Sequence, residues 1–68
     1  MGDWEVVYRA SILHRVEIVK GVLDQHNIKS IIVSKKDSNY HFGHFEVMVS
    51  RVDIIRAIKI IKDDIQFE

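Results

Sequence analysis

Four histidines are the residues of this chain best suited to chemistry, and two of them lie close together. His41 and His44 have a spacing that two metal ligands can use, and Glu46 follows two residues later. A zinc site needs three or four convergent ligands, and the chain has no cysteine to complete one. His14 and His26 lie about three turns apart on an expected helix, so they do not complete the set either. We therefore expect no metal and no cofactor, and keep a small metal- or metabolite-binding catalyst using His41, His44 and Glu46 as the alternative.

Other catalytic patterns are also weak. A Ser-His-Asp set can be assembled from any chain that has four His and several Ser, and no nucleophile-elbow motif is present. Asp63 and Asp64 are adjacent at an expected helix end, where we expect water to solvate them. Glu46 alone stands in a context that could raise the pKa of a carboxyl, and its competing interpretation is an exposed residue on a sheet. The sequence predicts a protein that is not an enzyme.

The segment from Lys35 to Gly43 is the most promising binding element. It breaks all periodicity and combines two cations, short polar side chains and aromatic rings, which predicts a long loop between the second and third strands. Binding residues concentrate on loops that a rigid scaffold holds. We predict that this loop binds a protein partner or a small anionic ligand; the alternative is a solvated connection. The candidate residues are Lys35, Lys36, Asp37, Ser38, Asn39, Tyr40, His41, Gly43 and Glu46.

Three alternating segments predict the strands that position this loop. They are Trp4 to Ala10, Ile28 to Ser34 and His44 to Val49. By their alternation, the side chains expected to face the helices are Trp4, Val6, Tyr8, Ile31, Val33, Phe45, Val47 and Val49. Those expected on the opposite, open face are Glu5, Val7, Arg9, Ile32, His44, Glu46 and Met48.

Two amphipathic segments predict helices. The first runs from about Ile12 to His26, with Ser11 as N-cap and Asn27 as the stop, and its core stripe consists of Ile12, Val16, Val19 and Leu23. The second follows a capping box of Ser50 and Asp53 and runs to about Lys62, with a stripe of Ile54, Ile58 and Ile61 that Ile65 could extend. Ile65 to Glu68 is either a short fourth strand or a frayed tail.

The order β-α-β-β-α, with an optional final strand, predicts an α+β fold in one domain spanning residues 1–68. We expect a ferredoxin-like sandwich in which an antiparallel sheet carries both helices on one face. A domain of 68 residues is small, so its core is marginal and self-association would help it.

The charge balance argues against nucleic acid and membrane as partners. Lys plus Arg equals Asp plus Glu at 10 each, which gives a formal net charge of +0 and no general attraction for phosphate or anionic lipid. RNA-binding sheets present aromatic rings on their open face, whereas the alternation predicts Trp4, Tyr8 and Phe45 on the core side. No signal peptide or membrane span is evident, and the lack of cysteine fits a reducing interior, so we expect a cytoplasmic protein.

Both helices carry apolar residues outside their predicted core stripes. A homodimer with two-fold symmetry would cover such residues, and these four are the candidates for self-association: Ile18, Val22, Val52 and Ile60. The alternative is that they lie singly at helix edges, covered by the stems of Arg15, Gln25, Arg56 and Lys59.

Four segments together give the chain a family resemblance that covers nearly its whole length. They are W-x-x-V-Y (Trp4, Val7, Tyr8), E-I-V-K-G-V-L (Glu17 to Leu23), K-K-D-S (Lys35 to Ser38) and F-G-x-x-E-V-x-V (Phe42 to Val49). The set resembles a small bacterial family of unknown function, grouped with prokaryotic signal-transducing proteins of PII-like (GlnB-like) ferredoxin fold. The stretch from K-K-D-S to F-G-x-x-E is its most specific part.

This resemblance implies the β-α-β-β-α architecture and no established enzyme activity. In PII proteins the corresponding loop, which is much longer, engages partners and helps to bind nucleotide. The chain lacks a recognisable nucleotide-binding motif, so neither nucleotide binding nor trimer formation carries over. The family-like positions are Lys35, Lys36, Asp37, Ser38, Gly43 and Glu46. A regulatory, signalling-type binding domain is the function that the resemblance favours.

Overall fold

A computed structural model of the chain describes residues 3–37 and 42–65. Its elements follow one another in the order β1 (Trp4–Ala10), α1 (Leu13–Gln25), β2 (Ser30–Asp37), β3 (Phe42–Ser50), the 3-10 turn η1 (Arg51–Asp53) and α2 (Ile54–Asp64). The expected α+β class, the antiparallel sheet and the two helices are confirmed. No helix in these described ranges has the length and apolar character that a membrane crossing requires.

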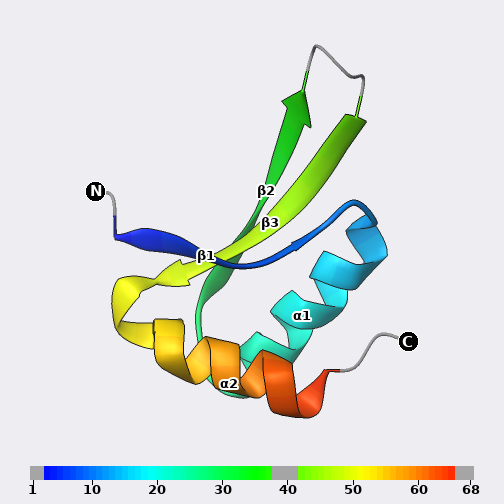
Figure 1. Cartoon of the computed structure of the whole chain (residues 1–68). Coiled ribbons are helices and arrows are strands. Elements are labelled where there is room, and N and C mark those ends of the chain that lie inside the picture. The colour runs from blue at the N-terminus through cyan, green and yellow to red at the C-terminus, as the bar shows by residue number, and fades with distance from the viewer. Residues whose placement is uncertain (1–2, 38–41, 66–68) are drawn as a thin grey trace.

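The sheet has the strand order β1-β3-β2, and β3 pairs antiparallel with both neighbours. Both helices cover the same face of the sheet, and the β2–β3 hairpin extends well beyond them (Figure 1). The Cα trace measures only 14 Å along its shortest axis, against 36 and 34 Å along the others. The fold is therefore two layers thick and leaves one sheet face without a helix, an arrangement compatible with a small ferredoxin-like fold.

The core lies between β3 and the two helices. Its central side chains come from successive turns of α1 and from alternate positions of β3, since these periods place residues on one face of a helix or strand. Side chains from β1, β2 and α2 close the edges of this cluster. The fully buried apolar residues are Val16, Val19, Leu23, Ile28, Val47, Val49 and Ala57.

A bulge in β1 changes which of its side chains face the helices. Val6 lies opposite Met48 and Tyr8 lies opposite Val47, so Val7 is the extra residue. Residues directly opposite in an antiparallel pair share one face of the sheet. Tyr8 therefore faces the helices, as predicted. Val7 was expected on the open face, and that prediction is wrong because Val7 packs against the core.

The same bulge overturns three other assignments in β1. Trp4 and Val6, which were expected to face the helices, lie on the open face, and each is 37% exposed. Glu5, which was expected on the open face, lies opposite Val49 and so on the helix side. Simple alternation fails here because one inserted residue exchanges the two faces along the rest of the strand.

In β2 the predicted faces are reversed. Ile32 lies opposite Val47 and packs against the core, whereas Ile31 and Val33 share the open face with β3 residues. Ser30 is buried on the helix side of the sheet, opposite Val49, although the pattern of apolar residues did not predict it as part of the core. Because β2 has apolar residues on both of its faces, its sequence alone does not show which face is buried. The pairing with β3 decides this.

The helices begin without the predicted side-chain caps. The N-cap of α1 is Ile12 rather than Ser11, and neither η1 nor α2 starts with a side-chain cap bond from Ser50 or Asp53. Asn27 does end α1 in the left-handed conformation, with φ 62°.

The core stripe of α2 also differs from the predicted one. Ala57 is fully buried, while Ile58, which the prediction placed in the core, is 48% exposed. Ile60, expected outside the core, packs against it. Ile54 and Ile61 of the predicted stripe do pack against the core, and with Ala57 they share one helix face at spacings of three and four residues, so Ile58 lies at its edge.

The loop predicted from Lys35 to Gly43 is shorter than expected. β2 continues to Asp37 and β3 already begins at Phe42, so both lysines belong to the hairpin strands. Ile65 has extended backbone after α2, and residues 66–68 lie outside the described residues, so the fourth-strand alternatives remain open.

Candidate functional site

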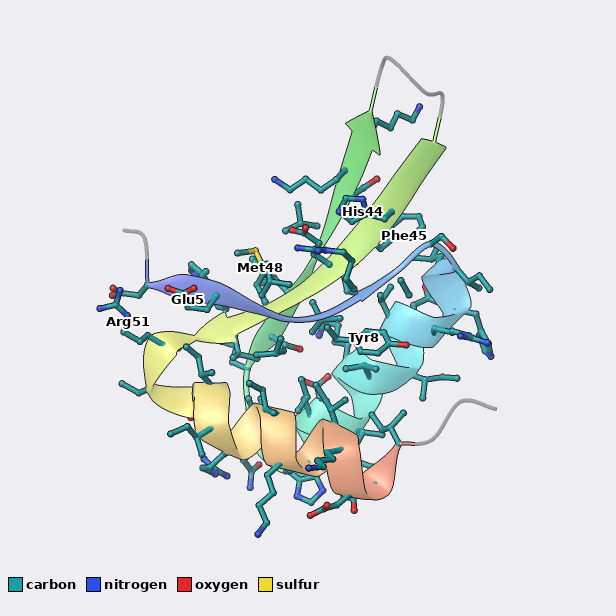
Figure 2. All side chains as sticks on the ribbon, viewed as in Figure 1. Glu5, Tyr8, His44, Phe45, Met48 and Arg51 are labelled. Carbon is teal, nitrogen blue, oxygen red and sulfur yellow. The ribbon has the colours of Figure 1, made fainter. Side chains whose placement is uncertain are left out.

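The uncovered face of the sheet changes from apolar to polar along its length. We call it the open face; in Figure 2, Met48 lies on this side, whereas Tyr8 lies between the sheet and α1. One cross-strand row joins Val6, Met48 and Ile31, and the next row joins Arg9, Glu46 and Val33. Nearer the tip of the hairpin, His44 lies opposite Lys35. An apolar half therefore borders a polar half on one surface.

Glu46 is the centre of the polar half. It is only 7% exposed although no helix covers it, because it occupies the middle strand between Arg9 and Val33. Arg9 Nε donates to Glu46 Oε2 at 3.2 Å, and His44 Nε2 lies 3.0 Å from the same oxygen. We call Arg9, Lys35, His44 and Glu46 the Glu46 cluster.

The pKa of Glu46 lies below its ordinary value. The hydrogen bond from His44 is the largest cause, and the positive charges of Arg9 and Lys35 act in the same direction. Burial raises the pKa and so opposes these effects, but it does not outweigh them. Glu46 is accordingly a carboxylate at neutral pH, and it acts as an acceptor for both neighbours.

The cluster carries more positive than negative groups. One carboxylate faces the guanidinium of Arg9, the ammonium of Lys35 and the imidazole of His44. The Arg9 side chain is 62% exposed and uses Nε toward Glu46, so its two terminal nitrogens lie at the rim of the site. Guanidinium nitrogens bind carboxylate and phosphate oxygens in pairs. The geometry is thus suited to holding an anion beside an apolar surface.

The structure brings together only some of the predicted site residues. Lys35 and Glu46 belong to the cluster, while Lys36 lies opposite Gly43 and so on the other face. Ser38, Asn39, Tyr40 and His41 lie outside the described residues, as does the side chain of Asp37.

Sequence reasoning missed Arg9 as a site residue. It was placed on the open face, but the alternation contained no sign that it lies directly opposite Glu46. Opposite charges at open-face positions of two strands are the signal that could have paired them, since such pairs stabilise neighbouring strands.

The alternative based on His41, His44 and Glu46 has one confirmed contact. His44 and Glu46 do lie within hydrogen-bond distance, but His41 is outside the described residues. Within residues 3–37 and 42–65, no group of three or more His, Cys, Asp or Glu side chains is arranged to hold a metal ion. His26 is instead engaged elsewhere: its Nε2 lies 3.2 Å from Asp64 Oδ2, so Asp64 is paired rather than merely solvated.

The aromatic side chains do not all lie on the core side, where the alternation predicted them. Tyr8 and Phe45 do lie on the helix side, but Trp4 lies on the open face rather than in the core. Among the side chains that the structure describes, Trp4 is the one Trp, Tyr or Phe ring on this face, and it lies on the edge strand β1, whereas RNA-binding sheets place their stacking rings on central strands.

The four self-association candidates fall into different environments. Val52 is 85% exposed and Ile18 is 37% exposed, as residues outside a core should be. Val22 is half-buried, and Ile60 packs against the core, so Ile60 is not a free surface residue. The placement outside the core is therefore wrong for Ile60, and the homodimer stays a prediction.

In comparisons with protein-family models, curated proteins and solved structures, nothing matches this chain.

Proposed function

We propose that this protein is a non-enzymatic, regulatory binding domain whose open face recognises an anionic group at the Glu46 cluster. The observation that carries the proposal is the buried carboxylate of Glu46, held by Arg9 and His44 on a sheet face that no described element covers. Burying a carboxylate costs free energy unless hydrogen bonds or opposite charges compensate it, so we infer that Glu46 has a function at this site. Here it fixes the orientation of two donors.

The apolar half of the open face indicates what the anion is attached to. Val6, Met48, Ile31 and Val33 lie directly beside the cluster. A ligand with a carboxylate or phosphate group and an apolar portion would pair its charge with Arg9 and cover this apolar row. A small anionic metabolite and the acidic segment of a protein partner both have this chemistry.

The resemblance to prokaryotic signal-transducing proteins of PII-like fold agrees with such a role. A central β3 between β1 and β2 is the arrangement of a split β-α-β unit, which supports assigning the finer GlnB-like topology. In this assignment the hairpin that carries Lys35, Lys36 and Gly43 corresponds to the partner-binding loop of that fold. We also propose that the protein acts in the cytoplasm.

A thermal-shift screen over anionic metabolites and nucleotides tests the proposal. A ligand present at about 100 times its dissociation constant adds about 2.7 kcal/mol of stability. In a domain of this size that corresponds to a rise in Tm of about 10–20 °C. We expect one or more anionic compounds to raise the Tm of the wild-type protein.

Arg9→Gln and Arg51→Gln form a matched pair of variants for this screen. Both remove one guanidinium, but Arg51 lies away from the cluster and faces Glu5 at 3.8 Å. The shift should vanish in Arg9→Gln and persist in Arg51→Gln. Equal loss in both variants would show that only overall charge matters and would refute the assigned site. Stoichiometric zinc or iron in the purified protein would instead favour the catalyst that uses His41, His44 and Glu46.

A further inference from the structure

The solvent-facing side of α2 carries an apolar row that the core does not use. Val52 is 85% exposed, Ile55 is 82% exposed and Ile58 is 48% exposed. Their spacing of three residues places them on one face of the η1–α2 segment. Ile55 and Ile58 also line an open hollow of about 420 Å³ together with Lys59, Lys62 and Asp63. Contiguous apolar surface beside a hollow is typical of a protein interaction site.

The charges that border this row are mostly positive. Lys59 and Lys62 flank it, and among the residues that the structure describes neither forms an ion pair. Asp63 supplies a single negative charge at one end of the hollow. The row thus has a local excess of positive charge, although the whole chain has a formal net charge of +0.

From this combination we infer that the outer face of α2, defined as Val52, Ile55, Ile58, Lys59 and Lys62, docks an acidic amphipathic helix of a partner protein. Apolar side chains of such a helix would enter the hollow between Ile55 and Ile58. Its flanking carboxylates would lie against the two lysines. This surface belongs to the helical layer, opposite the open face, so it is independent of the proposed anion site (Figure 1).

Charge and composition favour this occupant over two others. A second copy of the chain would bring the same lysines against each other, and like charges across an interface are unfavourable. A membrane surface is usually bound by longer helices with Trp, Phe or Leu on the apolar side. α2 has 11 residues, and the apolar row consists only of its Ile55 and Ile58 and of Val52 from η1.

A designed peptide provides the test. The probe is a synthetic helical peptide with leucines at i, i+3, i+4 and i+7 and glutamates on both sides of this row. Its control has the same leucines with lysines in place of glutamates. Chemical shifts of the isotope-labelled protein are followed during each titration. We expect saturable shifts of α2 amides with the acidic peptide and none with the basic one.

Two variants make the test specific. Ile55→Ser should weaken binding of the acidic peptide about tenfold, because a largely exposed Ile loses its burial in the complex. The double variant Lys59→Glu, Lys62→Glu should weaken it by a similar factor and should allow the basic peptide to bind. Neither change touches the core, so both variants should keep the wild-type thermal transition.

Four outcomes would overturn the inference. These are equal binding of both peptides, shifts confined to the open face, binding that Ile55→Ser leaves unchanged, and preferential binding of the wild-type protein to vesicles that contain phosphatidylserine. A concentration-dependent dimer that Ile55→Ser abolishes would assign the face to a second copy and would refute it as well.

Discussion

Ser30→Ala should make the protein more stable, although it removes a polar group. Ser30 is 4% exposed, and its hydroxyl has no hydrogen-bond partner among the described residues. An unsatisfied buried hydroxyl costs about 1–3 kcal/mol. The void left by removing one oxygen atom costs only about 0.3 kcal/mol. We expect a net gain of about 1 kcal/mol in the free energy of unfolding. For a domain of this size, that raises the Tm by about 4–8 °C.

Urea denaturation followed by circular dichroism measures this difference. Ser34→Ala is the matched control, because Ser34 lies on the same strand and the same side of the sheet but is exposed. The control should change stability by less than about 0.5 kcal/mol. A Ser30→Ala variant that is less stable than the wild type would mean that the hydroxyl has a partner, and the reasoning would be wrong.

Three further predictions concern the cluster, the core and the hairpin. Because the pKa of Glu46 is lowered in the folded protein, the ionised carboxylate stabilises the fold above pH 4.5, and this stabilisation disappears as the pH falls through the lowered pKa. Urea denaturation at a series of pH values should therefore show that the free energy of unfolding falls more steeply with decreasing pH in the wild type than in Glu46→Gln. Equal pH dependence in the two proteins would contradict this. Leu23→Ala should cost about 2–5 kcal/mol, a large part of the total for so small a domain, and should leave a broadened or absent thermal transition. Gly43→Val should lower the Tm because a Cβ there would lie 3.1 Å from the Lys35 carbonyl oxygen; an unchanged Tm would show that the strands separate freely at this point.

The Gly43 prediction keeps its direction but changes its reason. The sequence suggested a backbone conformation that other residues avoid, since Gly43 turns a loop into a strand. The structure places Gly43 inside β3, and its φ is not in the left-handed region. The close approach of the Lys35 carbonyl comes from strand pairing, which local sequence patterns do not contain.

The elements and the class of the fold were predictable because their periodicities are strong. Val16, Val19 and Leu23 recur at helical spacing, and Val47 and Val49 alternate along a strand, so these core residues were predicted correctly. Ile12, which was assigned to the same helix stripe, is the N-cap of α1 and is 51% exposed, so that assignment was wrong. The faces of β1 and β2 were not predicted correctly. Apolar residues occur at both odd and even positions of these strands, so only the bulge in β1 and the pairing with β3 determine which face packs against the helices.

The candidate site was predictable in part for the same reason. Glu46 and His44 share a strand, so their common face followed from alternation. Arg9 comes from a strand 37 positions away, and its contact with Glu46 depends on the register after the bulge. Lys35 was predicted as a loop residue because the segment from Lys35 to Gly43 shows no alternation and is rich in turn residues. β2 nevertheless continues to Asp37, in a hairpin that extends beyond the helices (Figure 1), where Lys35 is exposed and needs no apolar pattern.

Titration of the isotope-labelled protein with inorganic phosphate at constant ionic strength shows directly whether the open face binds an anion at the Glu46 cluster. We expect saturable shifts of the Arg9 Nε–H signal, the His44 ring signals and nearby β3 amides, with the signals of α2 unchanged. The same titration of Arg9→Gln should show no saturation. Small, linear shifts spread over all lysines and arginines, or saturable shifts that persist in Arg9→Gln, would contradict the proposed anion site.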